Sequence, residues 1–251
     1  MNKTLKLNII LFVLGIIGVL SFLFTDIDIA AFVPEAEGKF SPEAFKFLSL
    51  INPTIFLIIA VVAGGFMAPM TGLKAPLIEA IIAKEPAGEV LKKQLIWGIP
   101  LGLLGGVLIA TYSYLMTPIL PQAYAELSSK LSLSPVTRFL YGGITEEILL
   151  RWGFMTVIVW MVWKIFLKRE QKPGNVVFVF AILISAIAFG VGHLPIAFTL
   201  VKDTSFAFIF FVITANVIFG IIAGWLYWKK GLEAAMIAHM AAHCILIIPT
   251  V

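Results

Sequence analysis

The sequence predicts an all-α, polytopic transmembrane helix bundle of about 7 to 8 spans, and three observations lead to this fold class. Of the 251 residues, 61% are hydrophobic and 13% are charged, whereas a soluble domain has about 25% charged residues. The apolar residues form long stretches of the length, about 20 residues, that crosses a bilayer as a helix. The sequence also lacks the alternating short strands of a membrane β-barrel.

Seven apolar stretches are long enough to cross a membrane. They fall at about residues 8–25, 47–69, 95–117, 138–163, 176–198, 205–227 and 232–250. An eighth span arises if the fourth stretch breaks at Gly153. We expect these spans to form one integral membrane domain over residues 1–251, with the lipid bilayer around it.

The charges between the spans predict the orientation of the chain. Retained Lys and Arg mark the cytoplasmic side of a membrane protein. Basic residues lie before the first span and after the second and fourth, and Lys229 with Lys230 follows the sixth. Segment 26–46 instead holds five acidic residues against Lys39 and Lys46. The N-terminus is therefore predicted to be cytoplasmic, at the plasma membrane if the source is prokaryotic.

Local signals predict two helix ends and one further helix. Ser134 followed by Pro135 is typical of an N-cap and a first helical position, so the fourth helix begins there. Gly231 ends the sixth helix. Segment 73–93 mixes apolar residues with Lys and Glu at helical spacing, which predicts a helix on the cytoplasmic surface. Small residues that let spans pack closely recur at Gly102, Gly105, Gly106, Gly220 and Gly224.

Composition and missing motifs exclude several function classes. The net charge is +4, but the basic residues lie at the ends of apolar runs and form no patch, so no nucleic acid partner is expected. The single Cys244 excludes an intrachain disulfide and a cysteine-based metal cluster. The sequence also lacks HExxH, GxSxG, Walker and dinucleotide motifs.

Three charged residues lie deep in the fourth span. Glu146, Glu147 and Arg151 follow Pro135 by about 15–23 Å of helix, near the middle of a bilayer. A charge there is expected to face a partner or a water-filled cavity. Glu147 and Arg151 are four residues apart, acid first, which favours an ion pair. Glu146 is rotated by about 100° from Glu147, so the pattern predicts a free carboxylate beside a supporting pair. The alternative is one packing network of all three.

The remaining unusual polar groups are histidines and one asparagine in other spans. His239 and His243 share one face of the last span, and His193 lies in the fifth, four residues after Phe189, which can pack on its ring. Asn216 lies in the sixth span. A desolvated carboxylate with histidines as proton partners or oxyanion donors can activate water for peptide hydrolysis. Hydrogen-bonded packing histidines are the alternative.

The motifs that carry these residues resemble those of the CPBP family in order and spacing. Segment 146–151 resembles its EExxxR motif, segment 189–193 its FxxxH motif, and His239 its terminal histidine. This family contains CAAX prenyl proteases, including the type II enzymes, and bacteriocin-processing membrane proteins. The resemblance covers about residues 135–251, where the catalytic core is therefore expected.

The resemblance implies an intramembrane endopeptidase. Glu146 would activate water with His193, and His239 would stabilise the oxyanion, while Glu147 and Arg151 would hold the site together. The substrate would be a membrane-associated protein or peptide, either a CAAX-type prenylated protein or a bacteriocin or signal peptide. The rival hypotheses are a non-catalytic immunity or scaffold protein, and a proton-coupled carrier.

His243 departs from the family pattern, which usually has Asn at this position. Neutral His also donates an N–H, so His243 stays among the catalytic candidates. Glu146, His193, His239 and His243 together would also make a plausible zinc ligand set. We therefore expect no cofactor, with zinc as the alternative.

Overall fold

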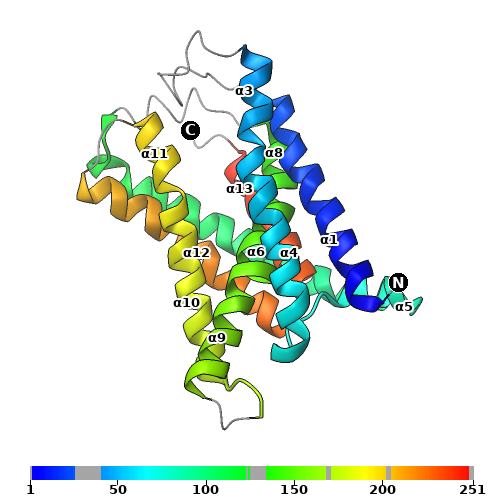
Figure 1. Ribbon diagram of the computed structural model, residues 1–251. Helices are drawn as coiled ribbons and strands as arrows, with labels where there is room; N and C mark the ends of the chain where they lie inside the picture. Colours follow the sequence, from blue (N-terminus) through cyan, green and yellow to red (C-terminus); the bar gives the residue numbers. More distant parts are fainter. Residues whose placement is uncertain are drawn as a thin grey trace.

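The computed structural model of the protein describes residues 2–25, 41–122, 124, 134–167, 171–201 and 205–248 (Figure 1). In these ranges the chain forms helices joined by turns. The first half contains α1 (Lys3–Leu20), η1 (Ser21–Phe24), α3 (Pro42–Ser49), α4 (Ile51–Thr71), α5 (Pro76–Ala83), α6 (Ala87–Met116) and η3 (Thr117–Ile119). The second half contains α8 (Pro135–Thr137), η4 (Arg138–Glu146), η5 (Ile148–Met155), α9 (Thr156–Phe166), α10 (Asn175–Gly192), α11 (Leu194–Leu200), α12 (Phe206–Lys229) and α13 (Leu232–Leu246).

Six helical segments of the described chain are long and apolar enough to cross a membrane, and α13 is a shorter seventh. They cover the centres of the seven predicted stretches. The fourth segment, Pro135–Phe166, continues through Gly153, so the eighth span does not arise from a break there. The predicted all-α, polytopic membrane bundle is confirmed.

The ends of the helices alternate as antiparallel spans require. Lys3 at the start of α1 pairs with Glu79 of α5 at 3.5 Å. The end that follows η1 instead meets the start of the fourth span, where the hydroxyls of Thr25 and Thr137 are 3.0 Å apart. Figure 1 shows the start of α1 beside α5, whereas α3 and α11 lie at the opposite end.

The predicted surface helix over 73–93 is only half correct. The short helix α5 forms, but Lys84 after it adopts a left-handed φ of 57°. Pro86 precedes α6, and proline disfavours helical conformation in the residue before it. The chain therefore turns at 84–86, and residues 87–93 lengthen the third span.

A small-residue face of α6 holds α13 in the bundle. Three glycines of α6 face three alanines of α13, in the order Gly98, Gly102, Gly106 against Ala234, Ala238, Ala242. The shared four-residue spacing lets the two backbones touch along one face. At Gly102 an added Cβ would overlap the backbone of Ala238. The position of α13, and of the histidines on it, therefore depends on this contact.

Gly102→Ala is expected to lower the free energy of unfolding by roughly 2–3 kcal/mol, because the added methyl group meets backbone that cannot rotate away. Gly88→Ala is the matched control, since Gly88 is also in α6 but has open space around it. The measurement is thermal unfolding of both variants in detergent. Equal melting temperatures for the two variants would contradict the packing described for α6 and α13.

Other predicted glycines also lie at close contacts. Gly220 and Gly224 of α12 pack against Ala186 and Ile182 of α10, as their spacing predicts. Gly231 joins α12 to α13 with a φ of 116°, which an L side chain rarely adopts. The tight turn makes α13 run back alongside α12.

Candidate active site

The fourth span departs from α-helical geometry where it carries the two glutamates. Ser134 caps its start by accepting a hydrogen bond from the backbone of Thr137 at 3.2 Å, as the Ser134-Pro135 pair predicts. Over 138–155 the chain then forms a π-helix in two segments, which meet at Glu147. Its i→i+5 hydrogen bonds place more residues in each turn, and such geometry is frequent at functional sites.

The π-helix changes the predicted relation between the glutamates. Glu146 stays outside the pair that Glu147 makes with Arg151, as expected. Its carboxylate nevertheless lies near the same histidine as that of Glu147. Glu147 Oε1 lies 2.8 Å from His239 Nδ1, and Glu146 Oε2 lies 3.9 Å from His239 Nε2. More residues per turn mean a smaller rotation between neighbours than about 100°. Both carboxylates therefore approach one imidazole, from its two nitrogens.

Glu147 and Arg151 form the predicted ion pair. Arg151 Nε lies 3.2 Å from Glu147 Oε2, and both side chains are fully buried. Arg151 Nη2 donates to the carbonyl of Gly220 at 3.4 Å, and the guanidinium lies 5.4 Å from the centre of the Phe189 ring. The pair therefore joins the fourth span to α10 and α12.

His239 has a fixed orientation. A carboxylate can only accept, so His239 donates its Nδ1–H to Glu147. The ring also packs on Phe219 and Phe189, with centroids 4.4 and 6.1 Å away. These contacts direct Nε2 toward Glu146, at a distance too long for a direct hydrogen bond. Glu146 keeps 18% of its side chain exposed, so its carboxylate remains available to another partner.

His243 stacks on His239, with ring centroids 4.9 Å apart and an interplanar angle of 17°. Gly142 of η4 provides the space for it, because a Cβ there would lie 2.6 Å from His243 Nε2. Within the described chain, His243 Nδ1 is buried without a hydrogen-bond partner. His243 thus has hydrogen-bonding capacity that the described part of the protein does not use.

His193 lies at the end of α10 and reaches this cluster through Phe189. Its Nδ1 is 2.8 Å from the Phe189 carbonyl, which can only accept, so Nε2 is left as an acceptor. The Phe189 ring stands edge-on to His193 at 4.7 Å, as the spacing predicts. Both His193 and Glu146 are in the described chain, and no ion pair joins them. The structure therefore does not bring them into direct contact.

Comparison with known proteins identifies the segment that holds this cluster. Residues 129–245 match the family model described as Type II CAAX prenyl endopeptidase Rce1-like. Over these residues the chain is similar to the Rce1-like family. Searches of curated proteins and of solved structures found no match. The matched segment begins close to the predicted residue 135, and the family that it resembles is one of CAAX-type intramembrane proteases.

Asn216 also lies within the matched segment, in α12. Its side-chain amide donates to the carbonyl of Val212 in the same helix at 2.8 Å. This bond stabilises the side chain on its own helix and does not reach the glutamates or the histidines. From its position in the sixth span, Asn216 is expected to support the site together with Glu147, Arg151 and Phe189, and this role stays a prediction.

The described residues of the matched segment form no ready-made zinc site. Among the residues described here, no three His, Cys, Asp or Glu side chains are grouped so that they could hold a metal. Nδ1 of His193 and Nδ1 of His239 are engaged by the Phe189 carbonyl and by Glu147. These bonds leave Nε2 of each ring as the nitrogen that could bind a metal, so the zinc alternative stays a prediction.

Sequence reasoning missed two contributors to the site, Gly142 and Phe219. Gly142 precedes Glu147 by five residues, which is one π-helical turn, and so lies on the same side of the helix. In an α-helix, residues five apart do not lie on the same side, so this spacing indicates a contact only once the π-helix is known. Phe219 has no distinguishing pattern among the 21 phenylalanines of the chain.

Proposed function

We propose that the protein is an intramembrane endopeptidase in which Glu146 activates the attacking water. The observation that carries the proposal is the contrast between the two glutamates. Glu147 is fully buried and committed to Arg151 and His239, whereas Glu146 is partly exposed and has no direct hydrogen bond to any described residue. A carboxylate in this environment is a competent general base.

The proposed reaction is hydrolysis of a peptide bond. Water attacks the carbonyl carbon while its proton passes to Glu146, and the acceptor Nε2 of His193 orients the water from the other side. His243 and His239 stabilise the oxyanion. The C–N bond then breaks as Glu146 returns the proton to the leaving amine.

The proposed substrate is a membrane-associated protein or peptide. The family description supports a CAAX-type prenylated protein, and a bacteriocin or signal peptide remains the alternative. The cluster draws on the fourth span, α10 and α13, so the scissile bond would have to enter between apolar helices. A peptide held near the membrane by a lipid anchor or by its own apolar segment meets this requirement.

His243→Asn is expected to keep activity within about threefold of wild type, because the Asn amide also donates an N–H. His243→Leu removes the donor and is expected to reduce kcat by roughly 100-fold. The measurement is cleavage of a farnesylated CAAX peptide by the purified protein, with and without phenanthroline. Loss of activity in His243→Asn that excess zinc restores would instead favour metal catalysis.

We further propose that the N-terminus is cytoplasmic, on the strength of the charges between spans. In a Cys244→Ala background, Ser41→Cys is expected to react with an impermeant maleimide on intact cells, because Ser41 precedes α3 on the proposed external side. Ala87→Cys, at the start of α6, is expected to react only after lysis. Labelling of position 87 in intact cells would show that the orientation is the opposite one.

A further inference from the structure

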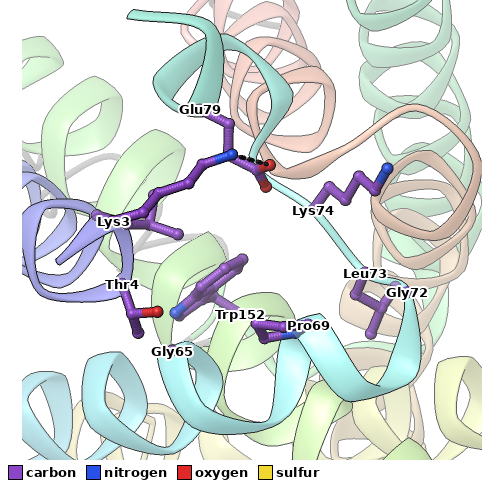
Figure 2. Close-up of a pocket in the computed structure, with 10 residues that line it drawn as sticks. Lys3, Thr4, Gly65, Pro69, Gly72, Leu73, Lys74, Glu79 and Trp152 are labelled. Atoms are coloured by element: carbon purple, nitrogen blue, oxygen red, sulfur yellow. Dashed lines mark ion pairs between the residues drawn. The ribbon is translucent and has the colours of Figure 1, made fainter. Parts of the chain in front are cut away.

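A cavity separate from the glutamate and histidine cluster opens between α1, α4 and α5. It has a volume of about 350 Å³, within the range of small-ligand pockets, about 300–1,000 Å³. Its lining includes Lys3 and Thr4 of α1, Lys74, Glu79 of α5 and Trp152 of the π-helix (Figure 2). None of the predicted catalytic residues lines it.

The indole of Trp152 has an unused donor at this cavity. Trp152 is 1% exposed, and within the described chain its Nε1–H is buried without a hydrogen-bond partner. Figure 2 shows the indole nitrogen directed toward Thr4 and Gly65 at one side of the space. A buried N–H is costly to leave unsatisfied. An acceptor that reaches this edge of the cavity, beside Thr4, would satisfy it.

The charges at the cavity favour an anion. Lys3 and Lys74 outnumber Glu79, which already pairs with Lys3 at 3.5 Å and accepts from the Ala75 backbone at 3.2 Å. The ammonium of Lys3, the hydroxyl of Thr4 and the indole N–H supply donors from different elements. Charge-assisted bonds of this kind suit a phosphate group.

The position of the cavity favours a lipid as the source of that phosphate. Lys3 is the first residue of α1 and Gly72 directly follows α4, so the lining lies at the ends of two membrane-length helices. Helix ends coincide with the headgroup region of a bilayer, where basic residues attract anionic lipids. From there the cavity reaches inward to Trp152. Leu7, Pro69 and Leu73 add apolar walls.

We propose that this cavity binds the phosphate of an anionic phospholipid headgroup. Lys3 and the Trp152 N–H hold the phosphate oxygens, and the acyl chains extend along the apolar surface of the bundle. The proposal does not depend on proteolysis, because no residue of the proposed mechanism takes part. Trp152 directly follows Arg151 in the chain, so the bound headgroup contacts the π-helix that carries the active-site glutamates.

The test is a titration of the purified full-length chain in detergent micelles with phosphatidylglycerol, phosphatidylcholine and inorganic phosphate, with Kd taken from the shift in melting temperature. Phosphatidylglycerol is expected to bind tightest. Lys3→Gln is expected to weaken it by roughly 10-fold, and Trp152→Phe by roughly threefold. Lys6→Gln is the matched control: Lys6 is an exposed lysine one turn further along α1, outside the cavity lining, and is expected to have no effect.

Three results would overturn the proposal. Equal weakening by Lys3→Gln and Lys6→Gln would mean general attraction to the basic surface. Equal affinity for phosphatidylglycerol and phosphatidylcholine would show that the cavity does not prefer an anionic headgroup. Equal affinity for phosphatidylglycerol and inorganic phosphate would show that it does not need a lipid. Lys3 is exposed, so Lys3→Gln decides the matter even if Trp152→Phe proves too unstable to purify.

Discussion

Glu146→Gln is expected to reduce peptide cleavage by roughly 100- to 10,000-fold, the contribution typical of a general base. The amide has nearly the volume of the carboxylate but cannot take the proton of water. Glu146 is partly exposed and lies 3.9 Å from His239, so no buried charge loses its partner. The melting temperature in detergent is therefore expected to stay within about 2 °C of wild type.

The measurement pairs cleavage of a farnesylated CAAX peptide with a melting curve on the same preparation. Glu146→Asp is a useful companion, because it keeps the base and shortens its reach. It is expected to retain part of the activity. If Glu146→Gln cleaves the peptide at the wild-type rate, Glu146 is not the general base.

Glu147→Gln is expected to lower the free energy of unfolding by about 3–5 kcal/mol, because Arg151 is then left charged and uncompensated in the interior. The loss is expected to lower the melting temperature by roughly 10 °C in a chain of this size. His239 also loses the carboxylate that accepts from Nδ1 at 2.8 Å, so activity falls together with stability.

A double-mutant cycle separates the pair from its surroundings. Arg151→Met alone leaves Glu147 as an unpaired buried charge, whereas Arg151→Met with Glu147→Gln removes both charges. The double variant is expected to be more stable than either single variant. Additive losses would show that Glu147 and Arg151 do not stabilise the fold as a pair.

Much of the fold follows from patterns that are local in sequence. Apolar length predicts the spans, because any helix that crosses a bilayer needs about 20 apolar residues. Ser134 with Pro135 marks a helix start through chemistry confined to one turn. The pair of Glu147 and Arg151 is likewise local, since a four-residue spacing brings the two side chains together in either kind of helix.

The π-helix could not be read from the sequence, because its stability depends on contacts far along the chain. Thr145 donates to the carbonyl of Gly15 in α1 at 2.8 Å, and Gly142 lies against His243 of α13. These contacts are 130 and 101 positions apart in the sequence. The approach of both glutamates to His239 follows from the same geometry, so the local sequence does not predict it either.

The catalytic roles of Glu146, His193, His239 and His243 stay predictions, as does a single domain over residues 1–251. The contacts between Glu147, Arg151 and His239 explain why the fourth span and α13 stay together, whatever reaction takes place beside them. A scaffold protein could keep that network, but it would have no need for a partly exposed Glu146. The carboxylate of Glu146 is thus the feature that separates a protease from a non-catalytic relative.

The most direct test is mass-spectrometric mapping of new protein termini in membranes of the source cells that express wild type, Glu146→Gln or no protein. Hydrolysis at Glu146 predicts at least one membrane-associated protein or peptide whose cleaved form appears with wild type and is missing in both other strains. Termini that are the same with wild type and Glu146→Gln, in cells where loss of the whole protein still has an effect, would contradict the account.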